Sequence, residues 1–507
     1  MSNRTVKAMN GAITGLFQHS ISIITQIVIA PLILILAGQE ALGSYAIVMQ
    51  IVGYGVFVDF GISSAFTRYL CQARGNLSDN KFFITTLLTG RNMLYLTNFL
   101  FCILLLSIST NIDIFLSESS EIISQIQISI LMMAIWVFIR TPLYIYNTAL
   151  TATQDLATIN IIVIFTNLIK LIASIFFVYN GFGLVGLIMA NILGEFCQFM
   201  TQKLIFKRKY RELNFVFSSG DKNLGIKLAR FGLSYWPVSI SAVLLLGSDN
   251  IIAATLYGAA TASIYYSTKM IGSMAIQLMA LIINNIYPAL NELVGLGNSD
   301  SVRKVYLRLI RYVLLLLAPG VLSIVIFSEG LINIWVGAEQ FAGLTMTLSV
   351  GLFVFVQVLC HMHGLVILAT GKIKYWGLIS IIFGLISIIS GYMFGKYLGF
   401  EWIIFGISLA MIPLLCFLIS RALSSIGLNL KIVIKEVFPP TFFSILPLVL
   451  FVWITDMYKL SETLSNIFIN LIIYALVFIV TTYIFGINKL EKNHIHARLN
   501  FIFKGSK

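Results

Sequence analysis

The sequence predicts an all-α integral membrane protein with about fourteen transmembrane helices. Its 507 residues are 59% hydrophobic and only 10% charged, which is more apolar surface than a soluble chain could bury. The apolar residues fall into runs that are long enough to cross a bilayer as helices. Three short turn motifs also recur at a nearly constant offset, which predicts an internal duplication.

The repeated motifs lie between long apolar segments and keep the same order along the chain. They are Gly38–Tyr45 and Gly258–Tyr265, Gly75–Asp79 and Gly297–Asp300, and Tyr179–Phe182 and Tyr397–Phe400. Their offset stays between 218 and 222 residues. We therefore expect a duplicated membrane unit, which is the usual architecture of secondary transporters.

The predicted membrane helices follow from the apolar runs in order. They lie at 11–37, 43–70, 82–110, 122–153, 156–179, 184–206, 229–257, 262–291, 304–328, 341–370, 373–396, 402–421, 437–456 and 463–486. The first six form a bundle within 1–206, a connector spans 207–228, and the next six form a second bundle within 229–421. The last two helices, within 437–486, are appended, and 487–507 is a tail. Because six crossings return the chain to its starting side, the two repeats should run parallel.

The distribution of Lys and Arg predicts the orientation in the membrane. Cations gather in the loop after the sixth helix, before the ninth helix and in the tail: Lys207, Arg208, Lys209, Arg211, Lys222, Lys227, Arg303, Lys304, Arg308, Arg311, Lys489, Lys492, Arg498, Lys504 and Lys507. The opposite loops are mainly acidic. Both termini should therefore be cytoplasmic. The net charge of +13 is mostly this bias, so it predicts anionic membrane lipids as partners and no nucleic acid.

Motifs for catalysis and cofactor binding are missing from the sequence. Gly371-Lys372 resembles a fragment of a phosphate loop, but Val366 stands where the first glycine belongs. The cysteines occur singly and without metal-ligand spacing, at 71, 102, 197, 360 and 416. No nucleophile and base are grouped at membrane depth. We therefore expect a transporter that is not an enzyme and needs no cofactor or metal.

Seven ionisable residues fall well within the predicted spans. They are Asp59, Arg91, Arg140, Lys170, Glu195, Asp249 and Lys269. Each costs roughly 2.5–3.5 kcal/mol at the bilayer centre, so each should face a cavity or a partner. Six of them form pairs of opposite sign at matching depth on sequential helices: Asp59 with Arg91, Lys170 with Glu195, and Asp249 with Lys269. One interpretation is that these are structural ion pairs.

Arg140 has no partner of opposite charge among these predicted pairs. It lies ~19 Å from the predicted cytoplasmic end of the fourth helix, just before Pro142. An unmated guanidinium at that depth indicates a water-filled cavity or an anionic ligand. Alternatively, it caps carbonyl groups that the Pro142 kink releases.

The intramembrane charges supply candidates for two roles. The cations are spread from one leaflet to the other and could bind an anion in successive steps as it crosses the membrane. The substrate-binding candidates are therefore Arg140, Lys170, Arg91 and Lys269. The carboxylates could couple protonation or cation binding to a conformational switch, so the coupling-ion candidates are Glu195, Asp249 and Asp59.

Several motifs carry a resemblance to a known family over essentially the whole chain. They are Gly38–Tyr45, Ser248–Asn250 followed by Gly258 and Tyr265, Ile334–Gly337, and Ala369–Lys372. With these the sequence resembles the polysaccharide transporter branch of the multidrug/oligosaccharidyl-lipid/polysaccharide (MOP) flippase superfamily. The resemblance implies a MATE-like, V-shaped pair of six-helix bundles. It also implies a cationic central cavity, for which Arg140, Lys170 and Arg91 are candidates by position.

The resemblance further implies a function. O-antigen flippases of this branch move an undecaprenyl-pyrophosphate-linked oligosaccharide from the cytoplasmic to the periplasmic leaflet of the bacterial inner membrane by alternating access. The expected partners are this lipid-linked substrate, membrane lipids, and the polymerase and chain-length regulator of the same pathway.

Three other functions stay open. A cation-coupled multidrug efflux carrier of the same superfamily would favour an acidic cavity, whereas four interior cations face three carboxylates here. A lipid II flippase, specific for the peptidoglycan precursor, is a close relative with the same number of helices. A membrane-embedded glycan ligase or polymerase would typically carry a large periplasmic loop, which the sequence lacks.

Overall fold

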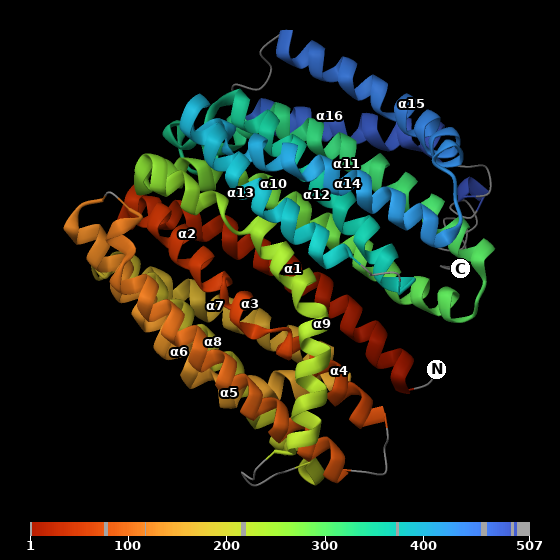
Figure 1. Ribbon diagram of the computed structural model, residues 1–507. Helices are drawn as coiled ribbons and strands as arrows, with labels where there is room; N and C mark the ends of the chain where they lie inside the picture. The colour runs from red at the N-terminus through yellow and green to blue at the C-terminus, as the bar shows by residue number, and fades with distance from the viewer. Residues whose placement is uncertain are drawn as a thin grey trace, which may run out of the picture. The chain divides into compact units, whose positions relative to one another are not determined.

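The computed structural model describes residues 3–75, 80–116, 118–213, 220–371, 375–457, 464–487 and 491–493. Regular structure in these ranges consists of helices (Figure 1). The α-helices are α1 (Asn3–Ala37), α2 (Gln39–Gly53), α3 (Gly55–Asp59), α4 (Ile62–Gly75), α5 (Asn80–Thr110), α6 (Ser120–Ala152), α7 (Leu156–Tyr179), α8 (Gly183–Lys209), α9 (Lys222–Leu246), α10 (Asp249–Gly295), α11 (Ser299–Trp335), α12 (Gly343–Ala369), α13 (Trp376–Leu398), α14 (Ile403–Ile426), α15 (Leu430–Met457) and α16 (Leu464–Thr481). Short turns of 3-10 or π helix occur at Ile112–Ile114, Arg211–Leu213, Ala338–Gln340, Phe400–Trp402 and Thr482–Gly486.

The membrane-spanning character of these helices agrees with the sequence. Thirteen stretches of the described residues are long and apolar enough to cross a membrane. One of them, Trp236–Val294, is 59 residues long and covers most of the two predicted helices 229–257 and 262–291. The prediction of an all-α membrane protein with about fourteen crossings is confirmed.

The two predicted helices 229–257 and 262–291 differ in detail from α9 and α10. The first ends early, at Leu246, and α10 begins at Asp249 and continues through a non-helical residue, Gly258. The structure therefore has an additional break at Gly247–Ser248, and the predicted loop corresponds to Gly258, where two helices meet at a non-helical residue.

The predicted helix 43–70 is wrong as a single element. The chain forms α2, α3 and α4 instead, with Phe60 (φ 50°) and Gly61 (φ 68°) in the left-handed region between α3 and α4. A Cβ atom on Gly61 would lie 2.3 Å from the carbonyl oxygen of Gly232 on α9. The helix breaks where two glycines let these backbones approach, a contact between residues far apart in the sequence.

The repeated turn motifs share their backbone conformation. Gly38 has φ 86° and ψ 174°, and Gly258 has φ 87° and ψ 169°, in a region that is essentially restricted to glycine. Gly181 and Gly399 likewise both have positive φ, at 84° and 117°. Gly38 and Gly258 therefore have the same backbone conformation, as a duplication requires, whereas Gly181 and Gly399 share only the sign of φ. The motif Gly75–Asp79 lies mostly outside the described residues.

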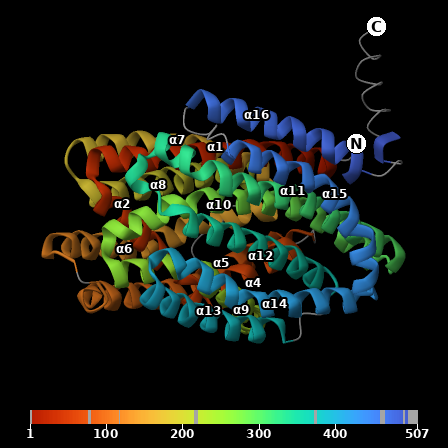
Figure 2. The same ribbon diagram turned by 90° about the horizontal axis from the view of Figure 1, so that it is seen from above.

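Two compact units make up the chain. The first contains residues 1–266 and 377–388, and the second contains 267–376 and 389–507. In the first unit, α5 packs against α6, α6 against α8, α8 against α7, and α7 against α1 (Figures 1 and 2). In the second, α11 packs against α12 and α15, and α12 packs against α14. The predicted division at 207–228 into two six-helix bundles, with two appended helices, stays a prediction.

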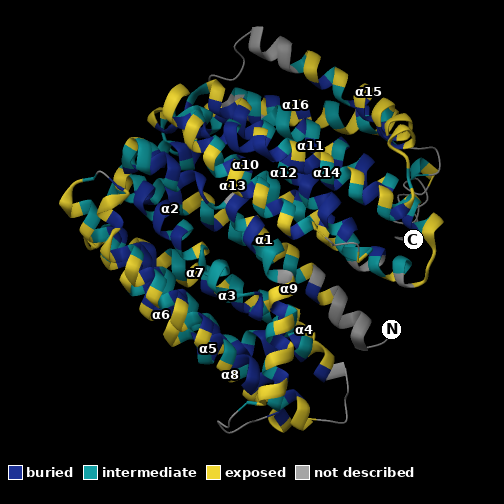
Figure 3. Ribbon diagram, viewed as in Figure 1, coloured by how far each residue is buried: buried dark blue, intermediate teal, exposed yellow. Residues whose placement is uncertain are grey.

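Helix α6 illustrates how the sequence positions interior groups. Trp136 is only 4% exposed, whereas Phe138, two residues on, is 41% exposed on the opposite face. Helices α5, α6 and α7 carry many exposed apolar residues, as expected for helices in lipid. Figure 3 shows exposed positions along α5 and α6. Toward one end of the unit, Phe66, Phe83 and Phe206 form a buried core between α4, α5 and α8. This core fixes the helices around the cavity described next.

Candidate functional site

The first unit contains an intramembrane cavity of about 600 Å³. Its walls come from α2, α3, α4, α5, α6 and α9, all within that unit. The polar or ionisable side chains on the walls are Asp59, Ser63, Ser64, Asn98, Arg140, Tyr144 and Ser239. Two of the residues singled out by sequence, Asp59 and Arg140, therefore line the same cavity.

The broken helix forms one wall of this cavity. Gly53 and Gly55 line it on either side of the break between α2 and α3, and a Cβ on Gly53 would meet no atom within 4 Å. Trp236 of α9 anchors the short helix α3, because its indole N–H donates to the carbonyl oxygen of Val56 over 3.2 Å. The wall is thus backbone-rich and held in place by an aromatic anchor.

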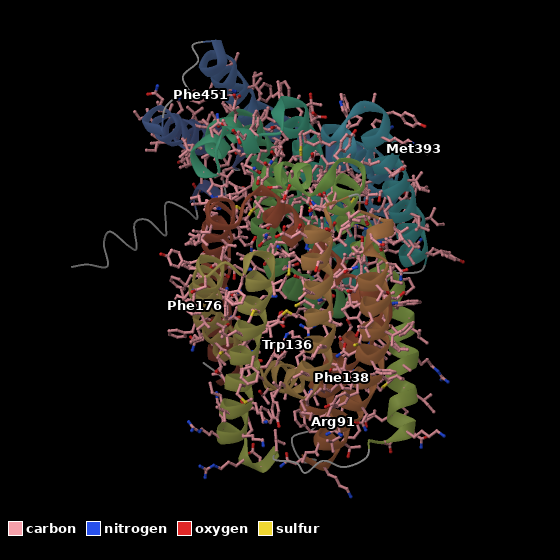
Figure 4. All side chains as sticks on the ribbon, turned by 90° about the vertical axis from the view of Figure 1, so that its left-hand side faces the viewer. Arg91, Trp136, Phe138, Phe176, Met393 and Phe451 are labelled. Carbon is pink, nitrogen blue, oxygen red and sulfur yellow. The ribbon has the colours of Figure 1, made fainter. Side chains whose placement is uncertain are left out.

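Arg140 is ion-paired, which corrects the expectation that it has no mate. Its Nη1 lies 3.0 Å from Oε2 of Glu195 on α8. The indole N–H of Trp136, one turn earlier on α6, donates to the same oxygen over 2.7 Å. The prediction considered only sequential helices, whereas α6 packs directly against α8, two helices further along the chain. Figure 4 shows Trp136 within this bundle.

The ion pair leaves most of the Arg140 donors available. A guanidinium has five N–H groups, and one of them is used by Glu195. Among the described residues, Arg140 has no other hydrogen-bond partner, and 28% of its side chain is exposed. The remaining N–H donors of Arg140 are therefore available to the cavity, and Glu195 neutralises the charge of the guanidinium. Tyr144, on the same helix, lines this cavity together with Arg140 and Asp59.

Lys170 is not the direct partner of Glu195, so this predicted ion pair is wrong. Its aliphatic chain lies across the backbone of α8 at Gly194, where a Cβ would be 2.1 Å from Lys170 Cγ. The ammonium nevertheless interacts electrostatically with both Glu195 and Arg140. The structure thus brings two cations and one carboxylate together near the middle of α6, α7 and α8.

Asp59 and Arg91 do not pair either. Asp59 accepts hydrogen bonds from the hydroxyl of Ser63, at 2.7 Å, and from its backbone N–H. The break at Phe60–Gly61 makes Asp59 cap the first turn of α4, which the prediction of a continuous helix could not foresee. Arg91 is buried, and its Nε and Nη2 donate to Oδ1 of Asn92. Figure 4 shows Arg91 nearer than Trp136 to the lower end of the bundle.

Asp249 lies in the first unit and Lys269 in the second, and their predicted ion pair stays a prediction. Asp249 is 2% exposed and accepts hydrogen bonds from Gln50 and Tyr265, at 2.9 and 3.1 Å. Gln50 also accepts from the backbone N–H of Ile251, so this network joins α2 to the start of α10. Lys269 belongs to the second unit, where its ammonium lies 5.7 Å from the centre of the Phe353 ring.

Sequence reasoning missed the residues that complete the site. Trp136 was the one with a detectable signal, because it stands four residues before Arg140 and its buried indole N–H needs an acceptor. Tyr144 also shares that helix, but Asn98 and Ser239 lie on α5 and α9, and no spacing rule links them to Arg140. Within the described residues, no three His, Cys, Asp or Glu side chains are arranged to hold a metal ion.

Comparison with known proteins identifies the family and the fold. The family described as polysaccharide biosynthesis protein matches residues 35–342. No curated protein matches the chain by sequence.

Solved transporters have a similar fold. The lipid II flippase MurJ, in an inward closed conformation, has a TM-score of 0.69 at 14% identity, over 94% of this chain and 98% of its own. An inward-facing multidrug resistance MATE transporter has a TM-score of 0.65 at 16% identity, over 82% of this chain and 98% of its own. A MOP superfamily transporter from Pyrococcus furiosus has a TM-score of 0.57 at 15% identity, over 83% and 95%. The chain therefore belongs to the polysaccharide biosynthesis protein family and has the fold of MOP superfamily transporters.

Proposed function

We propose that the protein is a flippase that moves an undecaprenyl-pyrophosphate-linked oligosaccharide, such as an O-antigen repeat unit, from the cytoplasmic to the periplasmic leaflet by alternating access. The observation that carries this proposal is the intramembrane cavity with the Arg140 guanidinium on its wall. A pyrophosphate is the anionic group of such a lipid, and the free N–H donors of Arg140 match its oxygens.

The arrangement of charge around Arg140 supports an anionic substrate. Lys170 adds a second cation next to the Arg140–Glu195 pair, so positive charge gathers at this point, while Asp59 elsewhere on the cavity wall balances the total. Serine, asparagine and tyrosine side chains on the cavity walls are suited to hydrogen bonding with sugar hydroxyls. Membership of a polysaccharide biosynthesis family agrees with a saccharide-bearing substrate.

The orientation belongs to the same proposal. The Lys and Arg bias supports cytoplasmic termini, and the proposed substrate implies the bacterial inner membrane. Arg91, Arg140, Lys170 and Lys269 then form the substrate-binding series, with Glu195, Asp249 and Asp59 as coupling-ion candidates. The polymerase and chain-length regulator of the pathway are proposed as partners.

Deletion of the gene in its natural host tests the function. The strain should lose its surface polysaccharide and accumulate the lipid-linked repeat unit in the cytoplasmic leaflet. Expression of the intact chain should restore both. A strain that keeps normal surface polysaccharide would contradict the proposal.

A cation-coupled efflux carrier is the second candidate, because Asp59 lines the same cavity as Arg140. An acidic group facing the cavity could attract a cationic drug. In that case the deletion strain would become more sensitive to cationic drugs and keep its polysaccharide. A lipid II flippase is the third candidate, and the fold similarity to MurJ over 94% of the chain favours it. It would be required for peptidoglycan synthesis rather than for surface polysaccharide.

A further inference from the structure

A second cavity lies in the other unit, at the N-terminal part of α11. Lys304, Arg308 and Arg311 follow at spacings of four and three residues, so they project from one face of that helix. They line a cavity of about 160 Å³ together with Leu307, Glu436 of α15 and Glu491. None of these residues belongs to the site around Arg140.

The carboxylate of Glu491 lies in this cavity and contacts the cations of α11. Its Oε1 accepts hydrogen bonds from Nη2 of Arg311 and from the Tyr312 hydroxyl, the latter over 2.7 Å. The same oxygen lies 3.6 Å from Nε of Arg308. One carboxylate oxygen therefore accepts two hydrogen bonds and forms a longer ion pair with residues of α11, and the side chain carrying it is only 15% exposed.

Donors remain unused around this carboxylate. Arg311 is 7% exposed, and its buried Nε has no hydrogen-bond partner. Lys304, at the outer edge, forms no ion pair within the described part of the chain. A buried N–H without a partner is rare in a native protein and calls for an acceptor. A phosphate group has more acceptor oxygens than a carboxylate and matches an arginine fork in two bonds.

We propose that Lys304, Arg308 and Arg311 form a binding site for a phosphate group, and that Glu491 is a tethered carboxylate that competes for it. The phosphate is carried by an anionic phospholipid headgroup or is free in solution. With the proposed orientation, this end of α11 faces the cytoplasmic leaflet, where anionic lipids are abundant. Binding of the phosphate would release Glu491 from α11.

The test uses the full chain in nanodiscs, with thermal unfolding and native mass spectrometry as readouts. The nanodiscs contain phosphatidylcholine alone, phosphatidylcholine with added inorganic phosphate, or phosphatidylcholine with phosphatidylglycerol. In phosphatidylcholine alone, Glu491→Gln should lower the unfolding temperature, because Arg311 loses its counter-ion. Phosphatidylglycerol should restore that temperature, and the variant should retain more of this lipid than the wild type.

The additions separate the two sources of phosphate. If phosphatidylglycerol restores the unfolding temperature of Glu491→Gln and inorganic phosphate does not, the ligand is a lipid headgroup. If inorganic phosphate also restores it, the ligand is free phosphate. Restoration by neither would overturn the proposal.

A second variant keeps the test decisive if Glu491→Gln does not fold. In the otherwise wild-type chain, Lys304→Gln should weaken phosphatidylglycerol binding about fivefold. Lys431→Gln is the matched control, because it removes the same charge from an exposed position of α15 outside the cavity. Equal lipid retention by these two variants would also overturn the proposal.

Discussion

Arg140 on α6 and Glu195 on α8 are joined by an ion pair of 3.0 Å, and Arg140 at the same time lines the cavity of the first unit. The pair allows a charged guanidinium to remain at membrane depth without a ligand. It also links the cavity wall to the carboxylate that we propose as a coupling-ion site.

Substitution of Arg140 should separate binding from folding. We expect Arg140→Gln to lower transport about 10- to 100-fold, because a charge-assisted hydrogen bond to the substrate is lost. Arg140→Lys should restore transport only in part, since an ammonium lacks the bidentate fork. Surface glycan and protein level are measured together.

The matched control is the double variant Arg140→Gln with Glu195→Gln, which leaves no unpaired carboxylate. It should regain any protein level lost in Arg140→Gln but not the surface glycan. If Arg140→Gln keeps full glycan, Arg140 has only a structural role.

Trp136 should contribute to stability through Glu195. Trp136→Phe removes the indole N–H donor and should lower the free energy of unfolding by about 1–2 kcal/mol. Ile135→Val is the control at a 52% exposed position of the same helix and should change stability by less than about 0.5 kcal/mol. Unfolding of both variants in the same detergent measures the difference, and equal stability would contradict the role assigned to Trp136.

Gly61 should tolerate no side chain. Gly61→Ala should destabilise the protein by more than about 1 kcal/mol, because φ is 68° and the Cβ would meet the Gly232 carbonyl oxygen. Gly320→Ala, inside α11, is the control, since a Cβ there meets no atom within 4 Å. It should leave stability unchanged or raise it by up to about 1 kcal/mol. Similar losses for both variants would contradict the close approach of α9 to the break before α4.

The topology has a direct test. Reporter fusions at Lys507 and within Ser218–Asp221 should be active only when the reporter functions in the cytoplasm. The physical reason is the excess of Lys and Arg in the connector and the tail. Activity of a periplasmic reporter at either site would contradict the proposed orientation.

Most of the architecture could be predicted from the sequence, because bilayer thickness imposes long apolar runs and glycine marks the turns. Gly38 and Gly258 were found this way, and their backbone angles agree closely. The break at Phe60–Gly61 could not be predicted, since it depends on Gly232, which is distant in sequence. The pairs Asp59–Arg91 and Lys170–Glu195 were misassigned for a similar reason. Depth along a helix can be read from sequence, but not which helices face one another.

Glu195 should couple transport to an ion gradient if its partner changes during the cycle. It lies between Arg140 and Lys170, and 19% of its side chain is exposed. Glu195→Gln should keep substrate flipping but lose its dependence on an imposed pH or sodium gradient. Reconstituted wild type and variant are compared with and without each gradient. A wild type without gradient dependence would leave Glu195 as a structural partner of Arg140.

The central claim is that this chain flips a lipid-linked oligosaccharide through the cavity that Arg140 lines. The most direct measurement reconstitutes the purified protein in liposomes with an undecaprenyl-pyrophosphate oligosaccharide in the inner leaflet. A lectin added outside then reports the fraction of oligosaccharide that has crossed. We predict that wild type exposes the oligosaccharide faster than protein-free liposomes and that Arg140→Gln reduces this rate about 10- to 100-fold. A wild-type rate equal to that of protein-free liposomes would contradict the account.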